Sequence, residues 1–139
     1  MPTITRSVLV EVPVSKAYAA VTDVECYPEF LPGCRAVTVE QRDSDRVRAK
    51  VSVSGMGRHE TFTTNNVLRA DSVTMELEDG PFEYLRGEWQ FSAIGDAGCR
   101  VSVQLEYKPK GILARMLSAM APAIADKVVD AFVTRMGEL

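Results

Sequence analysis

Residues 98–139 read GCRVSVQLEYKPKGILARMLSAMAPAIADKVVDAFVTRMGEL, and the apolar pattern changes its period within this stretch. Val101, Val103 and Leu105 alternate with polar residues, which is typical of a strand with one buried face. Further on, apolar residues follow helical spacing at Leu113, Leu117, Met120, Ile124, Val128 and Ala131. The stretch predicts a strand followed by a helix of about 25 residues, about 38 Å long. Because a proline inside a helix removes a backbone hydrogen bond, we expect a bend at Pro122.

Upstream of this helix the chain is mostly strand-like. A first strand over 5–12 is followed by a short helix that begins after Pro13 and by a proline-containing turn over 26–33. Turn signals such as RDSD, SGMG and EDGP separate the later strands, which we place at 34–42, 46–54, 58–69, 73–78, 84–93 and 98–107. Short connections of this kind favour an antiparallel sheet.

The dimensions of these elements predict how they pack. Seven strands make a sheet about 30 Å wide, whereas one helix is only about 10 Å across. The sheet must therefore curl around the long helix, and such a half-barrel encloses more space than the helix fills. We predict an α+β fold in which a curved antiparallel seven-stranded sheet wraps around the C-terminal helix, with short helices after the first strand. The length of 139 residues suits a single domain over 1–139.

Aromatic residues concentrate in GPFEYLRGEWQF, residues 80–91, which holds four of the ten aromatic side chains. Leu85, Trp89 and Phe91 share one face of the predicted strand, with Gly87 between them. Glycine inside a strand marks a bulge, a bend or a close approach of other atoms. Rings around such a position can wall a pocket or fill a core, and both interpretations stay open.

Other residues are candidates for the interior. Met116 and Met120 carry flexible side chains that suit either an adaptable pocket or an ordinary core. The segment HETFTTNN, residues 59–66, places polar groups beside Phe62 in a strand. Either Thr61, Thr63 and Asn65 or Thr64 and Asn66 face inward, where they could bind the polar head of an apolar ligand or satisfy one another.

Composition excludes several classes of protein. A net charge of -3 disfavours a protein that mainly grips nucleic acid, and no DNA partner is expected. The N-terminus lacks the apolar run of a signal peptide, and no window reaches the length of a membrane span. Three cysteines without a CxxC pair suit a reducing cytoplasm, and a single histidine makes a metal site improbable. No nucleophile stands beside a base, and no paired carboxylates indicate catalysis.

Three motifs carry a family resemblance. In order along the chain they are YPEFLPGC (27–34), TFTTN (61–65) and DGPFEYLRGEWQF (79–91). Together they resemble the bacterial RatA and coenzyme Q-binding protein family of the START-like helix-grip superfamily, also called the polyketide cyclase/dehydrase-like group. The resemblance covers essentially the whole chain, and GPFEY alone would be a weak motif.

This resemblance implies a tunnel for a lipophilic ligand under the C-terminal helix. It places Tyr27, Pro28, Phe30, Leu31 and Pro32 near the tunnel mouth, as a lid or rim, and Phe82, Leu85 and Trp89 in the wall. With the interior candidates above, the complete predicted ligand-binding set is Tyr27, Phe30, Leu31, Pro32, Phe62, Phe82, Leu85, Trp89, Phe91, Met116, Met120, Ile124 and Val128.

The resemblance also implies a function. We expect non-enzymatic binding of ubiquinone or a similar polyisoprenoid lipid in support of respiratory electron transport, with no cofactor required. Such a protein would be cytoplasmic and would contact the inner membrane transiently.

Two alternatives stay open. The first is a toxin-like protein that binds the large ribosomal subunit and blocks subunit association, with a basic patch formed by Arg46, Arg48, Lys50 and Arg58. The second is a polyketide aromatase/cyclase. The aromatase/cyclases of this superfamily with which the chain can be compared carry an arginine in the strand that matches TFTTN. In this chain no basic residue lies between His59 and Arg69.

Overall fold

The computed structural model describes residues 3–55, 57–111 and 113–139, with the side chains of 58 and 113–118 outside that description. The chain begins with β1 (Thr3–Val10), α1 (Val14–Thr22), the short turn η1 (Val24–Cys26) and α2 (Tyr27–Phe30). Six strands follow, and the chain ends in one long helix. These elements are β2 (Cys34–Arg42), β3 (Arg46–Gly55), β4 (Arg58–Leu68), β5 (Ser72–Asp79), β6 (Phe82–Ile94), β7 (Gly98–Pro109) and α3 (Leu113–Glu138).

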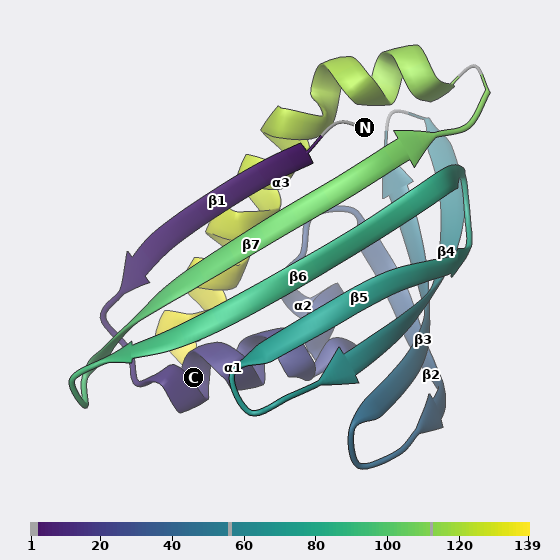
Figure 1. Ribbon diagram of the computed structural model, residues 1–139. Coiled ribbons are helices and arrows are strands. Elements are labelled where there is room, and N and C mark those ends of the chain that lie inside the picture. The colour runs from purple at the N-terminus through teal and green to yellow at the C-terminus, as the bar shows by residue number, and fades with distance from the viewer. Residues whose placement is uncertain (1–2, 56, 112) are drawn as a thin grey trace.

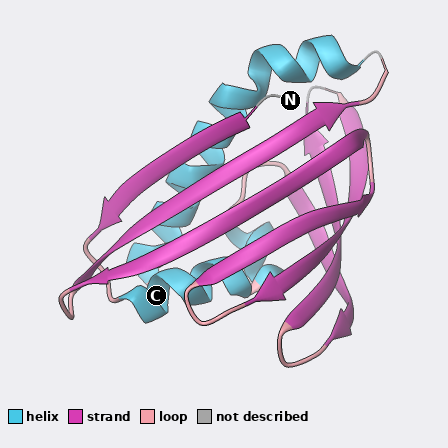
Figure 2. Cartoon of the chain, in the orientation of Figure 1, coloured by secondary structure: helices cyan, strands magenta, loops and turns pink. Residues whose placement is uncertain are grey.

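All seven strands form one antiparallel sheet in the order β1-β7-β6-β5-β4-β3-β2. The sheet curves, and the helices gather on its concave side (Figure 2). α3 runs along this side and changes direction within its length, with Pro122 inside it (Figure 1). The predicted fold, a curved seven-stranded sheet around a long C-terminal helix with short helices after β1, is confirmed. None of the described helices combines the length and the apolarity that a membrane crossing requires.

The register shows which residues point inward. In β3, Val47 and Ala49 are buried, as their alternation with charged residues predicts. Strand β4 pairs with β3 so that Asn66 lies opposite Val47 and Thr64 lies opposite Ala49. Residues opposite one another in a sheet share a face. The concave face of β4 therefore carries Phe62, Thr64 and Asn66, which answers the question that the sequence left open.

A register shift in β6 changes the face of one ring. Phe82 and Leu85 are three residues apart, so strict alternation would place them on opposite faces. Phe82 instead pairs with Pro109 and Leu85 pairs with Tyr107, because the ladder shifts between Phe82 and Tyr84. A bulge of this kind adds one residue to a strand. It turns Phe82 to the concave face, beside Leu85.

Candidate functional site

One end of the half-barrel is filled by aromatic rings. Phe132 of α3 is 4% exposed and lies at the centre of this group. Its ring centroid is 5.0 Å from that of Trp89, 5.3 Å from Tyr27 and 5.2 Å from Phe30, each in an edge-on arrangement. Such edge-on contacts are the favoured geometry of packed rings. We call Tyr27, Phe30, Trp89, Phe91 and Phe132 the ring cluster.

Trp89 and Phe91 each contact two other rings in this packing. The two rings stack with their centroids 6.5 Å apart. Phe91 also meets Tyr18 of α1 edge-on at 5.4 Å. These two strand residues, which the sequence placed either in a pocket wall or in a core, therefore pack against other rings of the chain. Their ligand-binding role stays a prediction.

The loop around α2, expected as a lid or rim, is held at several points. The Tyr27 hydroxyl donates a hydrogen bond to the carbonyl of Val21, and burial raises the pKa of Tyr27 far above its usual range. Gly33 adopts a φ of 78° and accepts a 2.8 Å hydrogen bond from the Ser54 amide. A Cβ at Gly33 would lie 2.6 Å from the Ser54 carbonyl oxygen. Only glycine fits here, and it ties the loop to β3.

α3 adds another attachment to this loop. The Arg135 guanidinium lies over the Phe30 ring at 5.2 Å and places Nη2 3.5 Å from the Glu29 carboxylate. A cation over an aromatic face is attracted to it. Leu31 packs against the same core, whereas Pro32 is exposed. The loop is therefore fixed to the helix and to β3 at once.

The opposite end of the concave face carries aliphatic residues and a pair of rings. Leu85 is buried there with Ile4 and Tyr107, and the other side chains around them are only partly buried. Phe62 and Phe82 meet edge-on with centroids 5.8 Å apart. We call this surface the apolar wall; it consists of Phe62, Met75, Leu77, Phe82, Leu85 and Leu105.

Gly87 lies inside the apolar wall, where the absence of a side chain leaves room for neighbouring residues. A Cβ at this position would come within 3.4 Å of the Met75 methyl carbon and 3.5 Å of Leu105 Cδ1. The ends of these two side chains therefore lie over the glycine. The gap that the sequence indicated at Gly87 is occupied by Met75 and Leu105.

α3 faces the apolar wall with small residues. Ala121 and Ala125 pack against it. Met120 and Ile124, which the sequence placed in the interior, are 39% and 40% exposed, so their predicted orientation is wrong. The cause is that this part of the helix is apolar on more than one side, and the alanines allow the closer approach to the sheet. Val128 packs against the core as expected, and the side chain of Met116 lies outside the described residues.

The polar groups of the concave face are satisfied within the chain. The Asn66 side-chain amide donates to the Val47 carbonyl at 3.1 Å and to the Thr64 hydroxyl oxygen at 3.2 Å. In the described part of the chain, no buried side-chain nitrogen or oxygen lacks a hydrogen-bond partner. Thr64 and Asn66 thus serve each other and the backbone of β3.

The predicted basic patch is partly neutralised by acidic side chains. Arg48 Nε lies 2.5 Å from a Glu78 carboxylate oxygen and 4.0 Å from Glu40. Hydrogen bonds from Asn65 and Arg48 lower the pKa of Glu78. Arg46 and Lys50 are exposed and form no ion pair with another described side chain, while the side chain of Arg58 lies outside the described residues.

The described residues hold no cluster of metal ligands, and their three cysteine thiols have raised pKa values. No group of three His, Cys, Asp or Glu among them could hold a metal ion. The hydrogen bond from the Cys26 thiol to Asp23, with a second contribution from Glu29, raises the pKa of Cys26 to about 11. Burial raises the pKa of Cys34 and of Cys99. Thiols with raised pKa values are poor nucleophiles near neutral pH.

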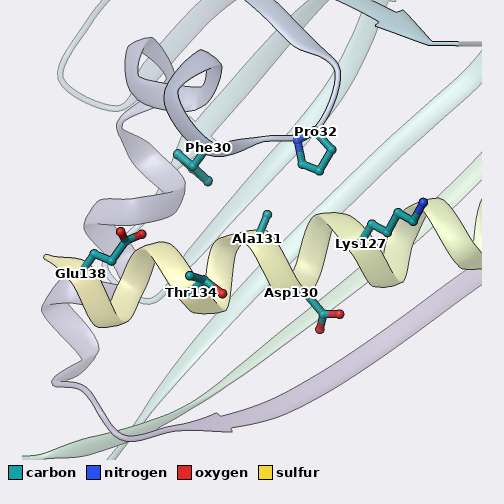
Figure 3. Close-up of a pocket in the computed structure, with 7 residues that line it drawn as sticks. All are labelled: Phe30, Pro32, Lys127, Asp130, Ala131, Thr134 and Glu138. Carbon is teal, nitrogen blue, oxygen red and sulfur yellow. The ribbon is translucent and has the colours of Figure 1, made fainter.

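An open hollow that the sequence did not indicate lies between the α2 loop and α3. It has a volume of about 340 Å³. Ala131 points from α3 towards Phe30 and Pro32, and charged side chains lie along the helix on either side (Figure 3). The residues that α3 contributes are Lys127, Asp130, Ala131, Thr134 and Glu138. Their grouping depends on the rotation of α3, which the helical pattern did not determine.

Comparison with known sequences gives a family and several relatives. Residues 10–136 match the model of the family described as polyketide cyclase/dehydrase and lipid transport. The chain is 38% identical over 138 residues to ribosome association toxin RatA of Pseudomonas aeruginosa, covering 98% of this chain and 96% of that protein. It is 35% identical over 141 residues to the RatA of Escherichia coli K12, covering 100% of this chain and 89% of the relative. A mitochondrial coenzyme Q-binding protein COQ10 of Drosophila melanogaster is 27% identical over 135 residues, covering 93% of this chain and 56% of that protein.

Solved structures show the same fold at low identity. The aromatase/cyclase Zhui of Streptomyces sp. R1128 superimposes with a TM-score of 0.89 at 15% identity, over 98% of this chain and 93% of that one. A START superfamily protein of Mycobacterium smegmatis gives 0.86 at 17% identity, over 98% and 97%. These likenesses concern the fold alone. The sequence relatives named above are two ribosome association toxins and a coenzyme Q-binding protein.

Proposed function

The chain belongs to the polyketide cyclase/dehydrase and lipid transport family and to its RatA group, and we propose that it associates with ribosomes without catalysing a reaction. The observation that carries this proposal is the similarity to two RatA proteins at 35% and 38% identity, along nearly the full length of both partners. The lack of an activated nucleophile among the described thiols also supports it.

Electrostatics limit how such an association can work. The chain carries a net charge of -3, which disfavours a broad grip on ribosomal RNA. Arg48 is already neutralised by Glu78 and Glu40. Any contact with phosphate groups would therefore depend on a few exposed cations, of which Arg46 and Lys50 lie on one strand.

Sedimentation with purified ribosomal subunits tests the proposal. We expect the protein to sediment with the large subunit, and we expect Lys50→Glu to weaken this if β3 contacts RNA. Arg100→Glu is the matched control, because Arg100 is also an exposed cation but lies on β7, away from β3. An unmodified protein that stays in the supernatant with either subunit at low salt would contradict ribosome association.

We propose a second function, binding of an apolar ligand such as a polyisoprenoid quinone, on a different observation. The apolar wall carries Phe62, Met75, Leu77, Phe82 and Leu105 in partly buried positions on a concave face, and α3 faces it with alanines. Each Å² of apolar surface removed from water contributes about 25 cal/mol. A long isoprenoid chain offers enough apolar surface to offset the cost of ordering it. Such binding would support respiratory electron transport.

Lipid extraction followed by mass spectrometry tests this second function. Native protein purified from a lysate that contains membranes should retain a lipid. The purified protein should also bind a short-chain ubiquinone saturably. Leu77→Ala should weaken that binding, whereas Leu68→Ala is the matched control, because Leu68 packs against the opposite core cluster. Equal loss of binding in both variants would count against a site at the apolar wall.

A further inference from the structure

The two edge strands of the sheet differ in how their free edges are protected. The strand order places β2 at one end of the sheet and β1 at the other. η1 and α2 lie against β2, an ion pair joins Arg42 of β2 to Glu25 of η1, and the register of β2 shifts at two points. Covering segments, charged side chains and bulges prevent an edge strand from pairing with another chain. The edge at β2 therefore carries several of these protections.

β1 carries far fewer of them. Its eight residues, Thr3–Val10, pair with β7 in an unbroken register, and no other described strand lies beside it in the sheet (Figure 1). The strand contains no lysine and no proline, and Leu9 is 66% exposed. Its single charged residue, Arg6, is neutralised by Asp126 of α3, whose carboxylate lies 2.5 Å from Arg6 Nε. A long edge with so little protection can accept a further strand.

The side chains of β1 suit pairing with a strand of the same sequence. The burial of Ile4 and Val10 shows that the even-numbered positions face the concave side. The convex side carries uncharged residues, namely Thr3, Thr5, Ser7 and Leu9. Threonine and branched apolar residues favour strand pairing. Two copies of this strand could therefore lie side by side without like charges meeting on the convex side.

A two-fold axis restricts the register of such a pair. Residues opposite one another in an antiparallel pair share a face, so the axis must pass beside a residue that faces its own copy. The two registers that overlap most of β1 have the axis at Arg6 or at Ser7. An axis at Arg6 would place two guanidinium groups opposite each other, which is unfavourable. An axis at Ser7 places Arg6 opposite Val8 of the second copy, and Leu9 opposite Thr5.

We propose that β1 pairs with β1 of a second copy of this chain, antiparallel and centred on Ser7, so that the two sheets become continuous. Leu9 is then partly covered by Thr5 of the second copy. Because the contact is confined to one pair of strands, it is small, and we expect a weak dimer. The pairing does not depend on ribosome association or on ligand binding, since β3 and the apolar wall belong to other strands.

Analytical ultracentrifugation of the full chain over a range of concentrations tests the pairing. Unmodified protein should show an equilibrium between monomer and dimer. Ser7→Lys should raise the dissociation constant about 2- to 5-fold, because two lysines then lie directly opposite each other. Ser92→Lys is the matched control and should leave it unchanged. Ser92 is also exposed on the convex face, but it lies on β6, which β7 separates from β1.

A mixture of charge variants tests whether the partner is a second copy and whether Ser7 faces itself. Ser7→Glu alone should weaken the dimer as Ser7→Lys does. An equimolar mixture of the two should associate more tightly than either alone, because opposite charges then face each other across the axis. Leu9→Lys gives a further variant at a highly exposed position, and it should also weaken the dimer. Circular dichroism checks that each variant is folded.

Three results would overturn the proposal. The first is unmodified protein that sediments as a monomer at every concentration, which would mean that β1 does not pair with itself. The second is a dimer that Ser92→Lys weakens as much as the folded Ser7→Lys or Leu9→Lys variant does. The third is a mixture of Ser7→Lys and Ser7→Glu that associates no more tightly than its components.

Discussion

Substitution of Phe132 by alanine tests whether the ring cluster stabilises the fold or forms the wall of a ligand site. Phe132 is 4% exposed and its ring meets those of Tyr27, Phe30 and Trp89 edge-on. Truncation of a buried phenylalanine to alanine costs about 3–5 kcal/mol. Because three favourable ring contacts are lost together, each of about 0.5–1.5 kcal/mol, we expect a loss near the upper end of that range.

Urea unfolding followed by tryptophan fluorescence and by circular dichroism measures this loss. With a urea m value of about 2 kcal/mol/M for a chain of this size, the midpoint should fall by about 2 M. Phe82→Ala is the matched control, because Phe82 is partly buried and meets a single ring, that of Phe62. We expect the control to cost less than half as much.

The reasoning would be refuted if Phe132→Ala cost no more than Phe82→Ala. That result would mean that the rings around Phe132 contribute little to the fold, as expected of side chains that surround an unfilled space. Lipid or quinone binding, measured on both variants below their unfolding midpoints, gives a second comparison. Binding at the apolar wall predicts that Phe82→Ala weakens it and Phe132→Ala does not.

Three further predictions concern single positions. Gly33→Ala should lower the melting temperature more than Gly57→Ala, although both glycines have a positive φ. A Cβ at Gly33 would lie 2.6 Å from a backbone carbonyl oxygen, whereas a Cβ at Gly57 would meet no described atom beyond its chain neighbours within 4 Å. Cys26 should react with iodoacetamide with a pH midpoint near 11, and Asp23→Asn should move that midpoint down towards the usual thiol range, because Asp23 is the largest cause of the raised pKa. Pro122→Ala should increase the helical circular dichroism signal and raise the free energy of unfolding by about 1–3 kcal/mol, since alanine restores a backbone hydrogen bond; a decrease would indicate that the bend in α3 is needed for its packing.

Much of the fold could be predicted from the sequence because the alternation of apolar and polar residues marks the inward face of strands such as β3. Val47 and Ala49 alternate with charged residues, and both are buried. One long helix is too narrow to cover the apolar face of a flat seven-stranded sheet, so the sheet is expected to curl around the helix. The connections of β2 to β7 are short, so each strand pairs with its neighbour in sequence.

The position of Phe82 could not be read from alternation. Its place on the concave face depends on the ladder shift between Phe82 and Tyr84, which the sequence does not mark with a glycine or a proline at the shifted residues. Residues before and after a bulge exchange faces. The family resemblance placed Phe82 in the wall together with Leu85, and the structure places both in the same cluster.

The rotation of α3 could not be predicted either, for a different reason. Between residues 119 and 125 the helix reads AMAPAIA, so every side of it is apolar and periodicity selects no single face. Burial of large side chains would favour Met120 and Ile124 on the inside, but Ala121 and Ala125 take that position. The small side chains of Ala121 and Ala125 therefore allow the helix to approach Leu85 and Tyr107 closely.

This arrangement gives the two ends of the half-barrel different physical characters. At one end, aromatic side chains from α2, β6 and α3 pack against one another, so a substitution there should mainly change the free energy of unfolding. At the other end, partly buried apolar residues of the sheet face the alanines of α3, so a substitution there should mainly change the binding of a ligand to that surface. Phe30 is the exception, because its ring belongs to the ring cluster and also lines the outer hollow. Substitution of Phe30 would therefore change the stability of the fold and the shape of that hollow together.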